Sequence, residues 1–140
     1  MNTLIIETLF RQYVAAFTQQ DIAATLSCYQ LPCTLHTPDK AVLISDENDF
    51  EREFSDIFAV LSHAGINKFN GTKASYSEVS SDLILACIDW QFFSQDGDLF
   101  TDFSAFYHIA LVEGLWKIVS VVSQELNQSI ELSTPLNISE

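Results

Sequence analysis

The sequence predicts an α+β fold in which three N-terminal helices pack on a strongly curved antiparallel β-sheet. Three observations support this prediction. Up to residue 65, apolar residues recur at helical spacing in three segments, and from residue 69 on four long β-rich runs follow, separated by turn residues. Helices that precede a β-meander are typical of α+β domains. A length of 140 residues fits a single domain.

Two helices and two short strands are expected in the first part of the chain. The segment Leu4–Phe17 carries two neighbouring apolar stripes, which predicts a helix that is buried over a broad face. Asp21 is a good N-cap for a short second helix, and Pro32 ends that helix because proline lacks an N–H group. The β-prone runs Cys33–Thr37 and Ala41–Ile44 then predict two strands or one hairpin.

A third helix is expected to open at Ser45 or Asp46 and to end at Gly65, where a left-handed cap costs least. Its acidic residues are Asp46, Glu47, Asp49, Glu51, Glu53 and Asp56. They predict a solvated helix side, or alternatively a docking face for a basic partner.

Four long strands account for most of the second half of the chain. The expected strands are Phe69–Ser80, Leu83–Ser94, Leu99–Val112 and Trp116–Glu125. In the second of them, one alternating set is apolar and should face the helices: Ile84, Ala86, Ile88, Trp90 and Phe92. In the third, both alternating sets are apolar, so a second subunit is expected to cover the outer face. Residues 126–140 are expected to form a flexible or loosely docked tail behind a single domain of residues 1–125.

Charge and composition exclude several classes of function. Nineteen acidic and six basic residues give a formal net charge of −13, which would repel nucleic acid and anionic lipid headgroups. The amino terminus has no signal-peptide pattern and no apolar run is long enough to span a membrane, so a cytoplasmic location is expected. Cys28, Cys33 and Cys87 form no CxxC pair, and neither a metal nor any other cofactor is predicted.

The order of elements, together with the ending Gly114-Leu115-Trp116-Lys117-Ile118, resembles the nuclear transport factor 2-like superfamily. This superfamily includes ketosteroid isomerases, SnoaL-like polyketide cyclases and scytalone dehydratase. The resemblance implies a cystatin-like cone with a pocket between the first helix and the concave face of the sheet.

A local similarity to the bacterial ketosteroid isomerases suggests site residues. It rests on Tyr13-Val14-Ala15-Ala16, Asp21, Thr34, Pro38 and Lys117-Ile118-Val119-Ser120. On this register Tyr13 takes the position of the family's oxyanion-hole tyrosine, and His108 lies near that of its hydrogen-bond-donating aspartate. Thr37 occupies the position of the general base, and a threonine cannot act as a carboxylate base.

The resemblance therefore implies a site with Tyr13 as hydrogen-bond donor and His108 as acid or base. Thr37, Trp90 and Phe106 are expected to line the pocket, although Trp90 and Phe106, like Tyr13 and His108, also suit an ordinary structural role in the interior. If the strand around His36 is extended, only one of His36 and Thr37 can enter the cone.

Two functions are consistent with this site. The first is a SnoaL-like domain that binds a small apolar molecule and acts as an isomerase, cyclase or lyase next to a carbonyl. The second is a non-catalytic ligand-binding or protein-interaction module of the same fold. In both, a homodimer is expected through the outer sheet face, with Tyr107, Ile109 and Leu111 at the interface.

Overall fold

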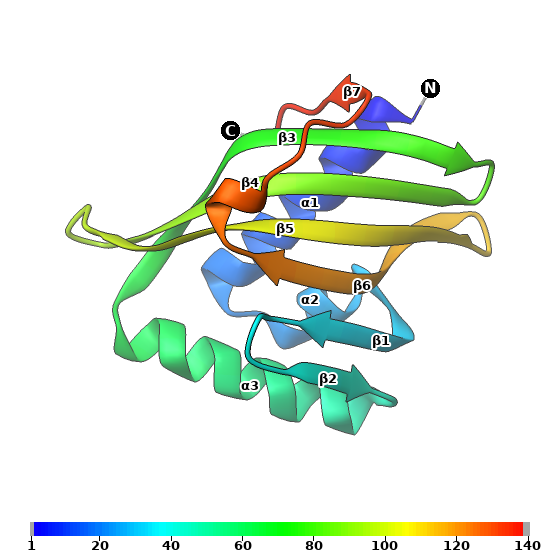
Figure 1. The fold of residues 1–140 in the computed structure, drawn as a ribbon. Coiled ribbons are helices and arrows are strands. Elements are labelled where there is room, and N and C mark those ends of the chain that lie inside the picture. The colour runs from blue at the N-terminus through cyan, green and yellow to red at the C-terminus, as the bar shows by residue number, and fades with distance from the viewer. Residues whose placement is uncertain (1, 139–140) are drawn as a thin grey trace.

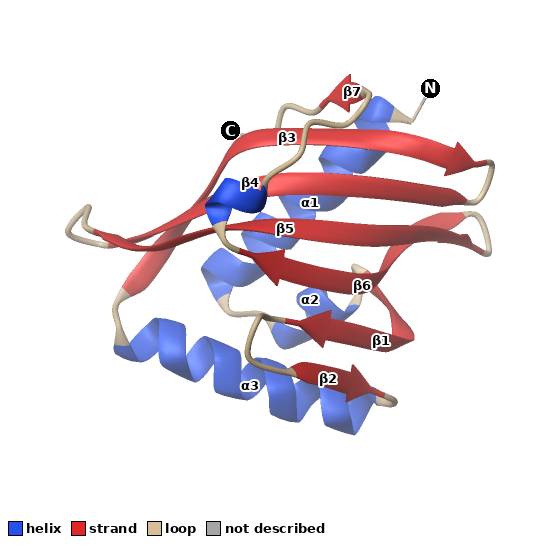
Figure 2. Ribbon diagram, viewed as in Figure 1, coloured by secondary structure: helices blue, strands red, loops and turns tan. Residues whose placement is uncertain are grey.

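The computed structural model describes residues 2–138 and confirms the α+β architecture. The helices are α1 (Thr3–Gln19), α2 (Ile22–Leu26), α3 (Glu47–His63) and the short 3-10 helix η1 (Leu126–Gln128). The strands are β1 (Tyr29–His36), β2 (Ala41–Ile44), β3 (Ile66–Ser80), β4 (Leu83–Ser94), β5 (Leu99–Val112), β6 (Leu115–Gln124) and β7 (Thr134–Pro135). Figures 1 and 2 show α1, α2 and α3 on one side of a single curved sheet.

The seven strands follow the order β2-β1-β6-β5-β4-β3-β7. The pairs are antiparallel except for β1 and β6, which run parallel. Strands β3 to β6 form the predicted meander, and β1 and β2 extend it beside α3 (Figure 1). The face toward the helices is here called the inner face, and the opposite face the outer face.

The N-cap predicted for α2 is present, and α3, predicted to open at Ser45 or Asp46, is capped by Asp46. The Asp21 carboxylate accepts a hydrogen bond from the Ala24 N–H (3.0 Å) at the start of α2. The Asp46 carboxylate accepts one from the Asp49 N–H (2.8 Å), which makes Asp46 the cap of α3. Gly65 follows the end of α3 with φ at +71°, the left-handed conformation expected there.

The second helix is shorter than predicted. It ends at Leu26, and β1 begins at Tyr29, so Pro32 lies inside a strand and does not end a helix. The pairing of β1 with β6 is irregular between Tyr29 and Thr34. An irregular stretch of this kind accommodates a proline because no ladder N–H is required there.

The predicted inner face of β4 is confirmed. Ile84, Ala86, Ile88 and Trp90 are each at most 2 % exposed and belong to the core beneath the helices. Aromatic rings from α1 and α3 fill much of the space above them, and Phe17 contacts Phe54 and Phe58 edge-on. The concave face of the sheet is thus closed by side chains from two helices.

The predicted orientation of β5 is wrong. Tyr107 and Ile109, expected on an outer dimer face, are 2 % and 0 % exposed and belong to the core cluster beneath the helices. They lie opposite Ala86 and Ile84 of β4, and directly paired residues share a face of the sheet. Leu111, the third residue of that expected interface, is 38 % exposed near the end of the strand.

The other set of β5 side chains, predicted to face the helices, lies on the outer face. His108 is exposed and lies opposite Leu85, while Phe106 lies opposite Cys87. Both had been expected in the pocket. The set that faces the helices, Ala105, Tyr107 and Ile109, is the more apolar one, whereas the outer set includes the exposed residues Asp102 and His108.

The carboxy-terminal segment, expected to be flexible or loosely docked, is held to the sheet as far as the structure describes it. Strand β7 pairs with β3, and Leu136 and Ile138 are 8 % and 5 % exposed. Figure 1 shows η1 on the outer face and β7 beyond β3 at the edge of the sheet. Residues 139–140 of the expected tail lie outside the described residues.

Candidate functional site

A cavity of about 170 Å³ lies between α1, α3 and the inner face of the sheet. Most of its wall is aromatic. The aromatic lining residues are Tyr13, Phe17, Tyr29, Phe54, Phe69, Trp90, Phe92, Phe103 and Tyr107. Val14, Leu35, Ile57 and Val121 add aliphatic surface, and His36, Thr37 and Ser123 are also in the lining.

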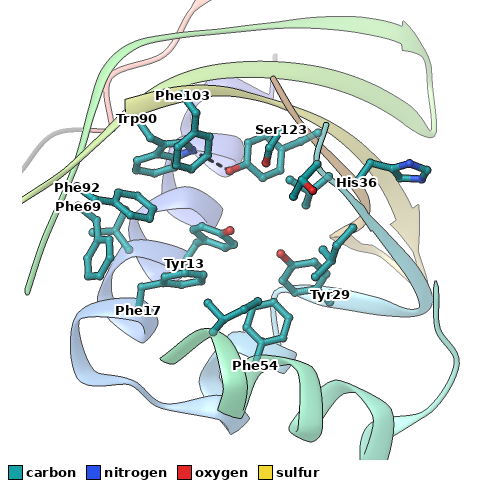
Figure 3. Close-up of a pocket in the computed structure, with 16 residues that line it drawn as sticks. Tyr13, Phe17, Tyr29, His36, Phe54, Phe69, Trp90, Phe92, Phe103 and Ser123 are labelled. Carbon is teal, nitrogen blue, oxygen red and sulfur yellow. Dashed lines mark hydrogen bonds between the residues drawn. The ribbon is translucent and has the colours of Figure 1, made fainter. Parts of the chain in front are cut away.

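Three phenols and one indole bring polar atoms to this apolar space. In Figure 3 the hydroxyl groups of Tyr13 and Tyr29 point toward the middle of the cavity. The Trp90 Nε1–H donates a hydrogen bond to the Tyr107 hydroxyl oxygen (2.9 Å). The ring centroid of Tyr13 lies 6.3 Å from that of Tyr29 and 6.1 Å from that of Tyr107.

Each phenol comes from a different element. Tyr13 lies one helical turn from both Phe10 and Phe17 of α1, and its ring stacks on Phe17 at 4.7 Å. Tyr29 begins β1, and Tyr107 lies on the inner face of β5, where Phe10 contacts it edge-on at 4.8 Å. Packing of rings against rings therefore fixes the positions of the hydroxyl groups.

The environment keeps the phenols protonated. Burial raises the pKa of Tyr13 well above its ordinary value of 10.0, and the electrostatic effect of Tyr29 and a hydrogen bond with it raise this pKa further. Burial is also the main reason why the pKa values of Tyr29 and Tyr107 lie well above 10.0. At neutral pH the cavity thus contains neutral hydroxyl groups that donate and accept hydrogen bonds.

His36 and Thr37 both contribute to the cavity lining, although only one of them was expected to face the cone. The imidazole of His36 points away from the cavity in Figure 3. The Thr37 hydroxyl belongs to the turn before β2, where it accepts hydrogen bonds from the N–H groups of Asp39 (3.3 Å) and Lys40 (3.2 Å).

The expected pair of Tyr13 and His108 is not brought together. Tyr13 borders the cavity, as do Thr37 and Trp90. His108 lies on the outer face of β5, opposite Ser120 of β6, and Phe106 is likewise absent from the lining. Since no carboxylate belongs to the lining among residues 2–138, this cavity holds no group placed like the base of a ketosteroid isomerase.

Sequence reasoning missed two of the three phenols. Tyr29 was placed in the second helix, and Tyr107 on the outer face of β5. The pairing of β4 with β5 was one available signal for Tyr107. Once Ala86 is placed inside, a hairpin register that sets Tyr107 opposite it places this phenol inside as well.

Neither a metal-ligand cluster nor a membrane-spanning helix occurs in the part of the chain that the structure describes. Within residues 2–138, no three His, Cys, Asp or Glu side chains are grouped closely enough to hold a metal ion. In the same part of the chain, no helix is both long enough and apolar enough to cross a membrane.

The family follows from a match over most of the chain. The model of the family described as "NTF2-like protein (DUF6841)" matches residues 3–126, from the start of α1 to the first residue of η1. The chain belongs to this NTF2-like family. No curated protein matches the sequence.

Solved structures show the same fold at low sequence identity. A cystatin-like domain of unknown function from Nostoc punctiforme gives a TM-score of 0.71 at 13% identity, over 86% of this chain and 75% of that one. An NTF-2 like protein of unknown function from Shewanella oneidensis gives 0.69 at 14% identity, over 88% and 98%. A ketosteroid isomerase-like protein from Erwinia carotovora gives 0.64 at 14% identity, over 94% and 98%. These likenesses establish the cystatin-like α+β cone and the NTF2-like fold.

Proposed function

We propose that this NTF2-like protein binds a small, mainly apolar ring compound in the aromatic cavity. The observation that carries the proposal is a mainly aromatic, partly open cavity toward whose middle the hydroxyl groups of Tyr13 and Tyr29 point (Figure 3). Ligand sites are typically concave and apolar with a few converging polar groups. A cavity of about 170 Å³ suits one or two fused rings, since an apolar cavity of roughly 150 Å³ binds benzene.

The ligand should also carry a hydrogen-bond acceptor. Trp90 can only donate, so its hydrogen bond leaves the hydroxyl proton of Tyr107 to be donated elsewhere. Hydrogen bonding also links Tyr107 to Tyr13 and Tyr13 to Tyr29, so a chain of hydrogen bonds runs from the indole to the Tyr29 hydroxyl. A carbonyl oxygen on the ligand would accept the hydrogen bond that this last hydroxyl can donate.

The geometry favours binding over catalysis. An isomerase, cyclase or lyase that acts next to a carbonyl needs a base beside the substrate. The imidazole of His36 points away from the cavity, and His108 lies on the outer face of the sheet. The phenols have raised pKa values and are poor bases at neutral pH.

Binding of 1-indanone, compared with indane, tests the proposal. Both are small bicyclic molecules, and only 1-indanone carries a carbonyl oxygen. Titration calorimetry should show saturable binding of 1-indanone and weaker binding of indane. Tyr13→Phe should lower the affinity for 1-indanone about fivefold, because a typical hydrogen bond contributes about 1 kcal/mol, while the affinity for indane stays the same.

Tyr76→Phe is the matched control. Tyr76 is buried, its hydroxyl lies 2.8 Å from the Thr3 hydroxyl, and it is absent from the cavity lining, so its loss should leave both affinities unchanged. Ser123→Phe, a substitution in the lining, should weaken the binding of both compounds by filling space. Failure of both compounds to bind the unmodified protein would contradict the proposal, as would binding that Ser123→Phe does not affect.

A further inference from the structure

A strap formed by residues 129–138 is anchored first on the outer face of the sheet. The Asp89 carboxylate, in a residue that is 8 % exposed, accepts hydrogen bonds at Oδ1 from the hydroxyl groups of Ser104 (2.9 Å) and Ser129 (2.6 Å). Ser104 belongs to β5 and Ser129 to the strap. The buried carboxylate therefore ties the start of the strap to the middle of the sheet.

The strap then follows the edge of β3. The Ser75 hydroxyl accepts a hydrogen bond from the Leu132 N–H (2.8 Å), and the hydroxyl groups of Ser77 and Ser133 lie 2.8 Å apart. Pairing of β7 with β3 continues this contact, and the Leu136 N–H donates to the carbonyl of Ala74 (2.8 Å). The path leads around the sheet edge toward α1 (Figure 1).

The end of the strap fits a notch left by a glycine. A Cβ atom added to Gly71 of β3 would lie 2.5 Å from Cδ1 of Ile138, so the Ile138 side chain occupies the space above this glycine. Beside it, the Asn137 N–H donates to the Glu7 carboxylate (2.6 Å), and Arg11 donates to the carbonyl of Asn137 (2.7 Å). The strap thereby joins β3 to α1.

Only a thin wall separates Ile138 from the ligand cavity. Val14 of α1 and Phe69 of β3 line the cavity, and the same two residues line a second hollow together with Gly71 and Ile138. The two side chains thus divide the cavity from the hollow that the strap borders. Phe69 is held by edge-on contact with the Phe92 ring at 4.7 Å, whereas Val14 is only partly buried.

We propose that the strap is a gate over a second opening into the cavity, between α1 and β3. Docked Ile138 supports Val14 and Phe69 in their closed positions; when the strap leaves, the two side chains can rotate and the cavity opens to solvent on that side. The functional importance of this gate rests on the proposed function, because only a ligand-binding cavity needs an entrance. Its existence can be measured without a ligand.

Acrylamide quenching of Trp90 fluorescence tests the gate directly. Trp90 lines the cavity and is 2 % exposed, and Trp116→Phe in every protein compared removes the only other tryptophan. A chain that ends at Leu132 keeps the Ser129 anchor and lacks β7 and Ile138. We expect its quenching constant to rise at least threefold, and Ile138→Ala to produce a smaller rise in the full-length chain.

Ile130→Ala is the matched control, since Ile130 belongs to the same strap and is 49 % exposed. It should leave quenching unchanged. Circular dichroism verifies that each variant is folded. If the shortened chain does not fold, the quenching of the Ile138→Ala variant tests the gate in its place. Faster hydrogen exchange at the β3 amides of a folded Ile138→Ala variant would show that the strap has been released. If Trp90 quenching in that variant is nevertheless unchanged, the gate proposal is overturned, because release of the strap does not open the cavity.

The kinetics of 1-indanone binding separate the gate from the proposed function. If the gate controls entry, both the association and the dissociation rates should rise in the shortened chain. A rise in quenching without any 1-indanone binding would support the gate and contradict the proposed function. Equal rates in the two chains, together with equal quenching, would overturn the gate and leave the binding proposal intact.

Discussion

The three phenols determine the chemistry of the cavity at the scale of single residues. Tyr13 keeps part of its surface open to the cavity, whereas Tyr29 and Tyr107 are 5 % and 2 % exposed. Their raised pKa values keep them neutral, so they can recognise an oxygen atom without a buried charge. This combination suits a ligand that is apolar except at one position.

The raised phenol pKa values predict how stability depends on pH. In the unfolded chain tyrosine titrates near pH 10, while the folded chain holds the protons of Tyr13, Tyr29 and Tyr107 to higher pH. The stabilising contribution is therefore complete below pH 10 and is lost as the pH rises from there through the folded-state pKa values.

Urea unfolding between pH 8 and 12 measures this loss, and absorbance at 295 nm reports phenolate formation. Tyr13→Phe should reduce the decline in stability above pH 10. If Tyr13, Tyr29 and Tyr107 titrate near pH 10 while the protein is still folded, the burial argument for these phenols is wrong.

At the scale of elements, the contact between β3 and the strap depends on one missing side chain. Gly71 leaves room for Ile138, and a methyl group there would meet Ile138 at 2.5 Å and Ile88 at 3.3 Å. Close packing of this kind is sensitive to a single added carbon. The absence of a side chain in the strand thus determines where the carboxy terminus docks.

Gly71→Ala should destabilise the protein by about 1–3 kcal/mol through overpacking. The same substitution in an Ile138→Ala background should cost less, because the shorter side chain removes the main collision. Chemical unfolding of the two single variants and the double variant gives the coupling free energy. Strictly additive costs would show that Gly71 and Ile138 do not interact.

At the scale of the whole molecule, the outer sheet face is the surface that α1, α2 and α3 leave uncovered. The strap covers the part of this face around Asp89. Elsewhere on the face, Leu85 is 41 % exposed and is paired across the strands with His108. The expected homodimer through this face stays a prediction, with Leu85 and Phe106 in place of Tyr107 and Ile109. A net charge of −13 opposes self-association at low salt and makes any dimer salt-dependent.

Light scattering at micromolar concentration should give twice the monomer mass of 15.7 kDa. Leu85→Glu should shift the mass to that of the monomer, because it places a charge on the apolar interface. Val60→Glu is the control, as Val60 is an exposed residue of α3, away from the sheet face. A monomer at both low and high salt would contradict the predicted interface.

The sequence by itself determined the α+β class, the N-cap of α2 and the inner face of β4. Each of these depends on local chemistry or on an alternation with one clearly apolar side, as in Ile84, Ala86 and Ile88. A carboxylate before a helix and a glycine after one act within a single turn, so Asp21 and Gly65 could be assigned from their neighbours alone.

Only the tertiary structure decided which groups meet in the cavity. Both sets of side chains on β5 contain apolar residues, and cross-strand pairing with β4 places Tyr107 inside and His108 outside. The gate likewise depends on Gly71 and Ile138, which are far apart in the sequence. Packing between distant segments leaves no periodic signal in the chain, and for that reason the phenol site and the strap emerge only from the folded molecule.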